Sequence, residues 1–361
     1  MLTILGSGLV EARTGGLVQS EILGTRPSVS VMVTTCQGDD RIATCLASLA
    51  RQTLAPEAFE ILVVQNGAPC RTPDIVLQFA ADHPRLSVRL LELSEPGLGH
   101  ARNVGLQAAR GTYVTYVDDD DWVTPGFLQA LLSHAEDGVV PVALVSTVTE
   151  GAEALSAGSA LDLDNYASKR LLPLAGQRVL AHQASTALQY NAGKLLRTDL
   201  ARAVRYDVTL RSGEDFVYWL TLLAHEPFDL RVVDATDDAV YCRALREKSL
   251  GRQGASYDFL VTQRLACLAA IEAVATPVAT TAKVAGQMRQ AQAAWINQYL
   301  AMHPGEHERV LLDARALGLR DMPWRDVLRE LGQDLAIAGF SRGASTPAAP
   351  MWPVGAGPSG R

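Results

Sequence analysis

The sequence is poor in lysine, aromatic residues and cysteine. Its 361 residues include four lysines, at positions 169, 194, 248 and 283, and aromatic residues make up 6%. The five cysteines form no CxxC pair and no metal-site spacing, which favours reduced thiols over a disulfide framework. A formal net charge of -7 argues against broad nucleic-acid binding, which needs a basic face.

Long apolar runs are also missing. The chain has no uncharged apolar run of about 18 residues, so no membrane-spanning helix is predicted. Its start, MLTILGSGLVEARTGG, lacks the basic segment and apolar centre of a signal peptide, and we expect a cytoplasmic protein. No P-loop, Rossmann GxGxxG or nucleophile elbow is present.

The chain does contain strands and helices in regular alternation. Apolar, β-branched runs predict strands at 29–34, 60–64, 86–93 and 113–117, and helical spacing predicts helices at 40–51, 74–81, 100–109 and 125–135. Such alternation indicates an α/β fold with a mainly parallel sheet. Ligands of such sheets bind beyond the carboxyl ends of the strands.

Composition divides the chain into four parts. Residues 1–27 are expected to be a loosely held leader, and residues 28–250 carry the α/β pattern. Residues 251–341 are predicted to be helical, with breaks at prolines. Residues 342–361 are rich in Gly, Pro, Ala and Ser, and we expect this tail to be disordered and dispensable.

A run of four aspartates, Asp118 to Asp121, follows the strand in GTYVTYVDDDDWVTP. Like charges at this spacing repel one another, and each seeks water or a cation. Mg²⁺ and Mn²⁺ prefer oxygen ligands and are commonly held by one or two carboxylates together with substrate phosphates. The alternative is a solvated acidic loop with Asp121 favouring the start of the helix after Pro125.

Three further segments carry candidate chemistry. The pair Glu214–Asp215 follows Gly213 and is a candidate base, although two acids also suit a helix start. The Gly-rich loop at 95–103 places Arg102 where it could hold a phosphate or a ribose. The basic segment at 241–249, which includes Arg243, is either a loop that closes over a pyrophosphate or a solvated face.

Together these segments resemble glycosyltransferase family 2. The resemblance rests on VSVMVTTCQGDDRIATCLASLARQT, EILVVQNGA, GKLLRTDL, SGEDFVYWLTLL and above all EPGLGHARNVGLQAARGTYVTYVDDDDWVTPGFL, and it covers about residues 28–250. It implies a GT-A fold, which is a Rossmann-like, mainly parallel sheet flanked by helices, here with a C-terminal helical extension. It also implies a nucleotide-sugar donor, Mn²⁺ or Mg²⁺, and inversion by single displacement without a covalent sugar-enzyme intermediate.

The resemblance assigns roles to individual residues. Asp215 is the expected base with Glu214 beside it, and Asp120 with Asp118 would hold the metal. The expected donor-binding residues are Thr35, Gln65, Asn66, Arg102, Asn103, Asp118, Asp119 and Arg243. UDP is the commonest nucleotide in the family and is expected here. Gln65–Asn66 stands where the family often has an acidic residue, and TTCQG replaces the usual PTYN, so dTDP and GDP stay open.

Two other functions are compatible with these residues. One is a non-catalytic sugar-nucleotide-binding or scaffold protein of the same fold, and the other is a Mg²⁺-dependent phosphohydrolase with Asp118 as nucleophile and Asp120 as acid. The expected acceptor is the hydroxyl group of a glycan, a lipid-linked compound or a small molecule. Peripheral membrane contact and a homo-oligomer formed through the C-terminal helices stay open.

Overall fold

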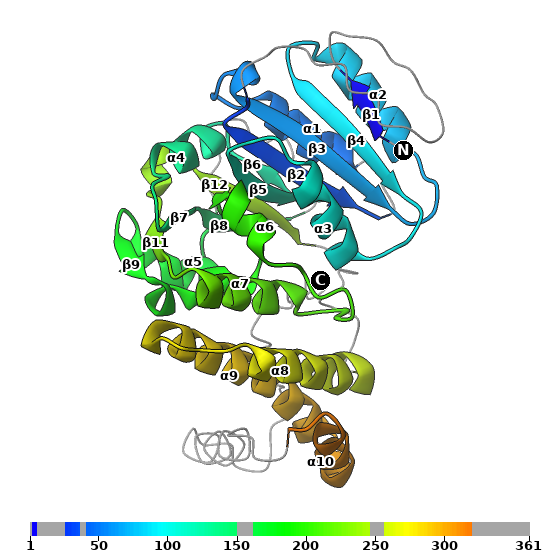
Figure 1. Ribbon diagram of the computed structural model, residues 1–361, viewed down its shortest axis with the longest axis vertical. Coiled ribbons are helices and arrows are strands. Elements are labelled where there is room, and N and C mark those ends of the chain that lie inside the picture. Colours follow the sequence, from blue (N-terminus) through cyan, green and yellow to red (C-terminus); the bar gives the residue numbers. More distant parts are fainter. Residues whose placement is uncertain (1, 6–25, 37–40, 150–161, 246–255, 320–361) are drawn as a thin grey trace, which may run out of the picture.

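The computed structural model describes residues 2–5, 26–36, 41–149, 162–245 and 256–319. Its centre is a six-stranded sheet in the order β1-β4-β3-β2-β5-β10 (Figure 1). The strands are β1 (Leu2–Leu5), β2 (Val29–Thr35), β3 (Phe59–Asn66), β4 (Ser87–Leu93), β5 (Tyr113–Asp118) and β10 (Leu196–Arg197). The predicted α/β fold with a mainly parallel sheet is confirmed.

The order of the strands creates a switch point between β2 and β5. From β2 the chain adds β3 and then β4 in parallel on one side, and then returns to add β5 in parallel on the other side. Open α/β sheets bind ligands at such a point, beyond the carboxyl ends of the strands. Asp118 pairs with Thr34 in this register, so the aspartate run begins beside the switch point.

Helices cover both faces of this sheet. One face packs against α1 (Arg41–Ala50), α2 (Thr72–Asp82) and α4 (Phe127–Ser133), with Val31, Ile42 and Phe127 in a shared core. The other face packs against α3 (Leu98–Ala108), α6 (Thr198–Ala203) and α7 (Glu214–His225), where Met32 and Leu106 are fully buried. Both faces of the parallel strands are therefore buried, as their apolar sequences require.

Two small sheets and short helices extend the domain beside β5. One sheet has the order β7-β11-β9, with β7 (Val139–Val142), β11 (Asp229–Val232) and β9 (Arg178–Leu180). The other has the order β6-β12-β8, with β6 (Trp122–Val123), β12 (Val240–Leu245) and β8 (Leu144–Thr149). The short helices α5 (Tyr166–Leu171) and η4 (Ser185–Gln189) lie between these strands in the sequence. The neighbouring strands β11 and β12 thus belong to different sheets.

The C-terminal helices pack onto the α/β domain. They are α8 (Gln263–Ala273), α9 (Ala279–Met302) and α10 (His307–Ala316), and α8 and α9 run below α7 in Figure 1. Cys267 and Ile271 of α8 and Met288 of α9 share one buried core with Trp219 of α7. The predicted boundary at residue 250 and the tail at 342–361 lie outside the described residues.

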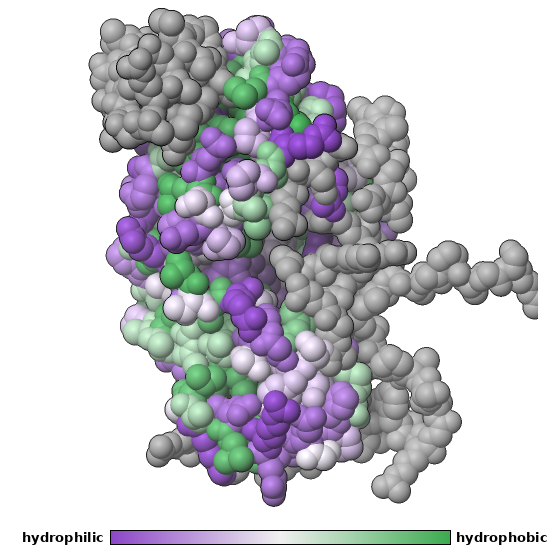
Figure 2. All heavy atoms as spheres, turned by 90° about the vertical axis from the view of Figure 1, so that its right-hand side faces the viewer, coloured by the Kyte–Doolittle hydropathy of each residue, from purple (hydrophilic) through white to green (hydrophobic). Residues whose placement is uncertain are grey.

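The described surface is mixed in character. In the view of Figure 2, hydrophilic and hydrophobic residues are interspersed over the described part of the face. Among the described helices, none combines the length and the apolar character needed to cross a bilayer. Residues 1–27 are expected from the sequence to be a loosely held leader, but residues 2–5 form β1 and pair antiparallel with β4.

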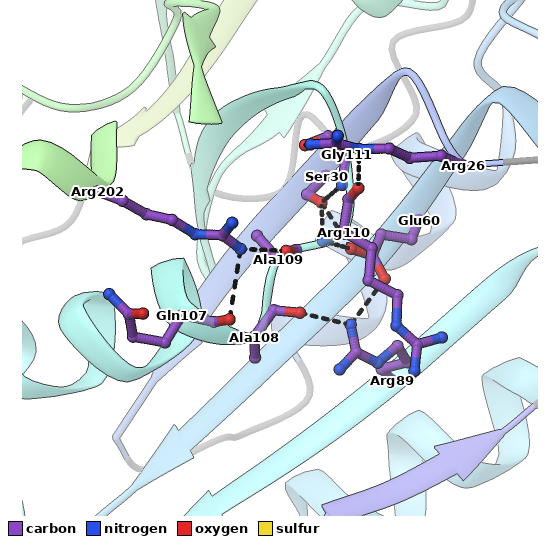
Figure 3. A network of polar contacts seen from close by, with 10 residues as sticks. All are labelled: Arg26, Ser30, Glu60, Arg89, Gln107, Ala108, Ala109, Arg110, Gly111 and Arg202. Carbon is purple, nitrogen blue, oxygen red and sulfur yellow. Dashed lines mark hydrogen bonds and ion pairs between the residues drawn. The ribbon is translucent and has the colours of Figure 1, made fainter. Parts of the chain in front are cut away.

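A buried polar cluster joins the strands at the amino end of the sheet, and we call it the amino-end clamp (Figure 3). Glu60 is 1% exposed and accepts hydrogen bonds from Arg89 at 2.9 Å, from the Ser30 hydroxyl at 2.6 Å and from the Arg110 N–H at 2.6 Å. The Gly111 N–H donates to Ser30 Oγ at 2.8 Å. A Cβ on Gly111 would lie 2.4 Å from the backbone nitrogen of Ser30, so this approach needs glycine.

Two arginines extend the amino-end clamp to the end of α3. Arg89 donates to the Ala108 carbonyl at 2.8 Å, and Arg202 donates to the Leu106 carbonyl at 2.7 Å and to the Ala109 carbonyl. The last carbonyls of a helix have no partner within the helix, and cationic side chains suit that end. The clamp therefore fixes the turn from α3 into β5.

Candidate active site

The aspartate run turns away from the sheet at the carboxyl end of β5. Asp118 is the last residue of the strand, and its carbonyl accepts a hydrogen bond from the Asp121 N–H at 3.1 Å. Asp119 and Asp120 lie in the turn between them and are partly buried. The side chain of Asp118 is 48% exposed, so part of the run faces solvent at the switch point.

Asp121 has a structural role that the sequence reading missed. Its carboxylate accepts hydrogen bonds from the Tyr241 hydroxyl at 2.7 Å and from the Ala244 N–H at 2.9 Å. The same hydroxyl accepts from the Asp118 N–H at 3.1 Å. Burial, followed by the charge of Asp118, raises the pKa of Asp121 to about 7. Asp121 thus ties the turn to β12. At the start of α4 it is Asp238, and not Asp121, whose carboxylate accepts the Gly126 N–H.

Asp118 and Asp120 are the predicted metal ligands of the run. Both carboxylate oxygens of Asp121 bind protein groups, so Asp121 is committed to the turn itself. Among the described residues there is no group of three or more His, Cys, Asp or Glu arranged to hold a metal ion. A cation that takes one or two protein carboxylates and completes its ligands with phosphate and water suits this arrangement.

Arg102 connects the aspartate run with the second acidic pair. It is 5% exposed and lies on α3, where its Nη1 donates to Glu214 Oε1 at 2.7 Å. Its Nη2 lies 4.0 Å from Asp118 Oδ1, and its guanidinium carbon is 5.5 Å from the centre of the Tyr206 ring. Two acidic groups 96 positions apart, at 118 and 214, therefore meet at one buried cation.

Asp215 lies at the start of α7 next to this ion pair. Its carboxylate accepts the Phe216 N–H at 3.0 Å. Desolvation and the neighbouring charge of Glu214 raise the pKa of Asp215 to about 7, although Arg102 and Lys194 act in the opposite direction. A carboxylate with a pKa near neutrality is suited to accept a proton at physiological pH.

The structure gives the predicted donor-binding amides partners within the protein. Asn66 is 2% exposed, donates to the Thr35 carbonyl at 2.8 Å and accepts the Gly97 N–H at 2.9 Å. Asn103 both donates to and accepts from the backbone of Tyr206, each at 2.9 Å. These amides hold the loops around the switch point in place, and a direct contact of either one with a donor stays a prediction.

Other predicted donor residues lie at the same end of the sheet. Gln65 is buried and donates to the Ala68 carbonyl at 3.0 Å. Thr35, at the end of β2, is 2% exposed, and its hydroxyl has no hydrogen-bond partner among the described residues. A buried hydroxyl without a partner is costly, which makes Thr35 the predicted donor residue with a free polar group. Arg243 lies on β12 in register with Thr147, and the segment at 246–249 is outside the described residues.

Lys194 is a second buried cation that the sequence reading did not single out. It is 1% exposed and donates to the carbonyls of Ala187 at 2.7 Å, Ala192 at 3.0 Å and Tyr190. Burial lowers the pKa of Lys194 well below its usual value, and the charges of Asp215 and Asp118 oppose this shift. The sequence feature that points to this buried lysine is its place in the stretch NAGKLL, because lysine is scarce in this chain.

Comparison with known proteins links part of the chain to a family. Residues 30–192 match the model of glycosyl transferase family 2. The uncharacterized glycosyltransferase EpsJ of Bacillus subtilis is 37% identical over 116 residues, which are 32% of this chain and 33% of that protein. The chain thus matches about a third of the length of this curated relative.

Solved structures show the same fold at low sequence identity. TarS 1–349 of S. aureus in complex with UDP has a TM-score of 0.55 and 20% identity, with 85% of this chain and 92% of that chain covered. The mannosyltransferase PcManGT from Pyrobaculum calidifontis, in complex with GDP-Man and Mn²⁺, has a TM-score of 0.54 and 19% identity over 86% and 81%. The predicted GT-A fold is confirmed.

Proposed function

We propose, on the basis of the match of residues 30–192 to the glycosyl transferase family 2 model, that the protein moves a sugar from a nucleotide-sugar donor to a hydroxyl acceptor with inversion. The observation that supports this most strongly is the meeting of Asp118 and Glu214–Asp215 at Arg102. It brings a candidate donor end and a candidate base, from distant parts of the chain, to one buried cation.

In the proposed reaction Asp215 is the catalytic base. The acceptor hydroxyl attacks the anomeric carbon of the donor sugar and passes its proton to the Asp215 carboxylate. The bond between the anomeric carbon and the leaving phosphate oxygen breaks, and the nucleoside diphosphate departs with the electron pair. One displacement inverts the anomeric centre and leaves no sugar on the protein.

Glu214 and Arg102 position the base in this mechanism. Their ion pair at 2.7 Å fixes the first turn of α7, because both side chains are buried and each neutralises the other. Arg102 also lies 4.0 Å from Asp118, so one side chain is close to both the donor end and the base. We propose in addition that Arg102 contacts the donor phosphates or ribose, so that Arg102→Ala raises the donor KM.

The aspartate run is proposed to bind Mn²⁺ or Mg²⁺ through Asp120 and Asp118. The bound ion would neutralise the diphosphate leaving group. Asp121 keeps the turn in shape through Tyr241 and Ala244. Asp119 is proposed to contact the donor without holding the ion.

UDP-sugars are the proposed donors. This rests on the family and on the fold shared with TarS, which is described in complex with UDP. PcManGT carries GDP-Man, so GDP-sugars form the second arm of the test, and dTDP-sugars form the third. The amide of Gln65 and the hydroxyl of Thr35 are the groups at this end that would meet the nucleotide.

The test is a donor panel with purified protein. Thermal shift with each nucleotide sugar in Mn²⁺ identifies the donor, because a ligand bound only to the folded state raises the Tm. Release of nucleoside diphosphate is then measured in Mn²⁺ and in EDTA for the unmodified protein, Asp120→Ala and the matched control Asp119→Ala. We expect Asp120→Ala to lose nearly all activity and Asp119→Ala to lose less.

Each outcome assigns the function. Full activity of Asp120→Ala in EDTA would overturn the metal assignment. Release of inorganic phosphate from simple phosphomonoesters would identify a phosphohydrolase. Donor binding without turnover for any acceptor hydroxyl, including glycans and lipid-linked sugars, would identify a binding protein.

A further inference from the structure

The turn that leads into Asp215 is not stabilised by a side-chain cap of its own. Gly213 is the residue before α7, has φ +83° and makes no side-chain cap. The left-handed conformation favours glycine, and a helix start without a cap needs other support. The position of the proposed base is therefore set by what packs against this turn.

Helix α8 from the C-terminal region packs directly on it. The Cys267 thiol lies 3.7 Å from the Gly213 carbonyl, and a Cβ on Gly213 would come within 2.6 Å of Cys267 Sγ. One residue earlier, the Ser212 hydroxyl accepts a hydrogen bond from Arg264 at 2.5 Å. The contact leaves no room for a side chain between α8 and the turn.

Arg264, on α8, is held in place by the segment before α8 and by α9. It is 5% exposed, and it also donates to the Phe259 carbonyl at 3.2 Å and to Gln292 Oε1 of α9 at 3.3 Å. A planar guanidinium presents donors in a fixed fork, so three bonds lock its orientation. Burial lowers the pKa of Arg264, and the neighbouring Cys267, Asp215 and Glu214 oppose that shift.

All three of these hydrogen bonds go to neutral oxygens. A buried guanidinium is costly unless negative charge compensates it, and the carboxylates at the start of α7 are close enough to act on it. Arg264 therefore contributes positive charge behind the turn while its Nη2 fixes the Ser212 hydroxyl. Orientation and charge both act on the segment that carries the proposed base.

We propose that Arg264 is a positioning residue for Asp215, so that the helices α8 and α9 are part of the framework of the active site. This inference rests on the proposed function, in which Asp215 is the base. It gives the C-terminal helices a role in turnover that the family domain at residues 30–192 does not contain.

The test compares Arg264→Met, Arg264→Lys and the control Arg289→Met. Arg289 joins the same two helices through an exposed ion pair with Glu272 at 3.0 Å, and no hydrogen bond or ion pair described for it reaches the turn. We expect Arg264→Met to lower kcat roughly 10²-fold, since small misplacements of reacting groups have effects of that size. The donor dissociation constant and the activity of Arg289→Met should change less than about twofold.

The pH profile of kcat separates positioning from general damage. The charged and titratable groups that act on Asp215 or on this turn are Glu214, Arg102, Lys194, Arg264 and Cys267. Removing the positive charge in Arg264→Met should move the acidic limb of the profile to higher pH. Arg264→Lys keeps the charge, so it should restore the limb while kcat stays below that of the unmodified protein.

Two outcomes would overturn the inference. The first is a folded Arg264→Met protein with unchanged kcat and pH profile, while Asp215→Asn is inactive. The second applies if Arg264→Met fails to fold and Arg264→Lys shows the same kcat and profile as the unmodified protein.

An activity-independent measurement distinguishes this failure from failure of the proposed function. If no donor supports turnover, or if Asp215→Asn and Glu214→Gln both stay active, the proposed reaction is wrong whatever Arg264 does. The Tm values at pH 8 of Arg264→Met, Asp215→Asn and the double variant then still test the contact. We expect Asp215→Asn to raise the Tm more in Arg264→Met than in the unmodified protein, and equal shifts would overturn the inference.

Discussion

Both ends of the central sheet hold acidic side chains close to an arginine. Those at the amino end are buried and hydrogen-bonded, whereas those at the carboxyl end are partly exposed or have a raised pKa. At the amino end, Glu60 accepts three hydrogen bonds, including one from Arg89, and both side chains are nearly inaccessible. At the carboxyl end, Asp118 is 48% exposed and lies 4.0 Å from Arg102. The pKa of Asp215 at that end is raised to about 7 by desolvation and by Glu214.

This difference distinguishes carboxylates that stabilise the fold from carboxylates that suit the binding of a ligand. A buried carboxylate whose partners are all within the protein is stable as an ion and has no capacity left for a ligand. A carboxylate that is crowded by another carboxylate and only partly compensated is poised to take a proton or a cation. Substitutions at the amino end should therefore change the free energy of unfolding, and substitutions at the carboxyl end should change kcat.

The largest effect is expected for Asp215→Asn. The variant keeps the size and polarity of the side chain but cannot accept the acceptor proton, so kcat should fall roughly 10²–10⁴-fold. Donor and metal affinity, measured by calorimetry, should survive. An active Asp215→Asn together with an inactive Glu214→Gln would reverse the two roles.

At the amino end, Arg89→Met should act on stability and leave turnover intact. The change leaves Glu60 as an uncompensated buried charge, with a cost of about 3–5 kcal/mol in the free energy of unfolding. Urea denaturation measures this cost, and kcat at low temperature should stay normal in the folded fraction. The double variant Arg89→Met/Glu60→Met removes both charges and should recover part of the lost stability. A lowered kcat in folded Arg89→Met would contradict the assignment of the amino end to stability alone.

The pH dependence of the Tm tests the raised pKa of Asp215 at the carboxyl end. Because the folded pKa of Asp215 is raised to about 7, its stabilising contribution is fully present below the unfolded pKa and is lost as the pH rises through about 7. An asparagine side chain cannot ionise, so Asp215→Asn should have a higher Tm than the unmodified protein at pH 8.5. The advantage should shrink at pH 5.5, and a constant difference between the two pH values would contradict the raised pKa.

The smallest effect is expected for Asp119→Ala. We propose that Asp119 contacts the donor but not the ion, so the variant should keep measurable turnover and nearly the same Mn²⁺ dependence. Titration of activity with Mn²⁺ checks this against Asp120→Ala. Equal losses in the two variants would place both carboxylates on the ion.

The sequence predicted the fold and the location of the acidic groups, because those features depend on local patterns. Strand and helix periods gave the sheet, and the position of Asp118 at a strand end placed it beyond the sheet. The amide of Asn66 illustrates what the sequence could not predict. Its two backbone partners come from Thr35 and Gly97, and only the folded chain brings them together.

Long-range ties account for the other differences. For the run that contains Asp121 the sequence predicts a cation site, with a solvated loop as the alternative, yet Asp121 binds Tyr241, which lies 120 positions later in the chain. Arg264 reaches Ser212 across 52 positions. Neither partner carries a local pattern, since a single tyrosine or arginine in an apolar segment looks like an ordinary core or surface residue.

The tie between Asp121 and the Tyr241–Ala244 segment also affects how the protein is made. Ser30, Glu60, Arg89 and Gly111 of the amino-end clamp have all left the ribosome once residue 111 has emerged. The aspartate turn must wait for Ala244, which lies 123 residues after Asp121. At typical rates of protein synthesis that delay is on the order of ten seconds. A nascent chain would therefore carry the residues of the clamp, together with an Asp121 that still lacks its β12 partners, for that interval.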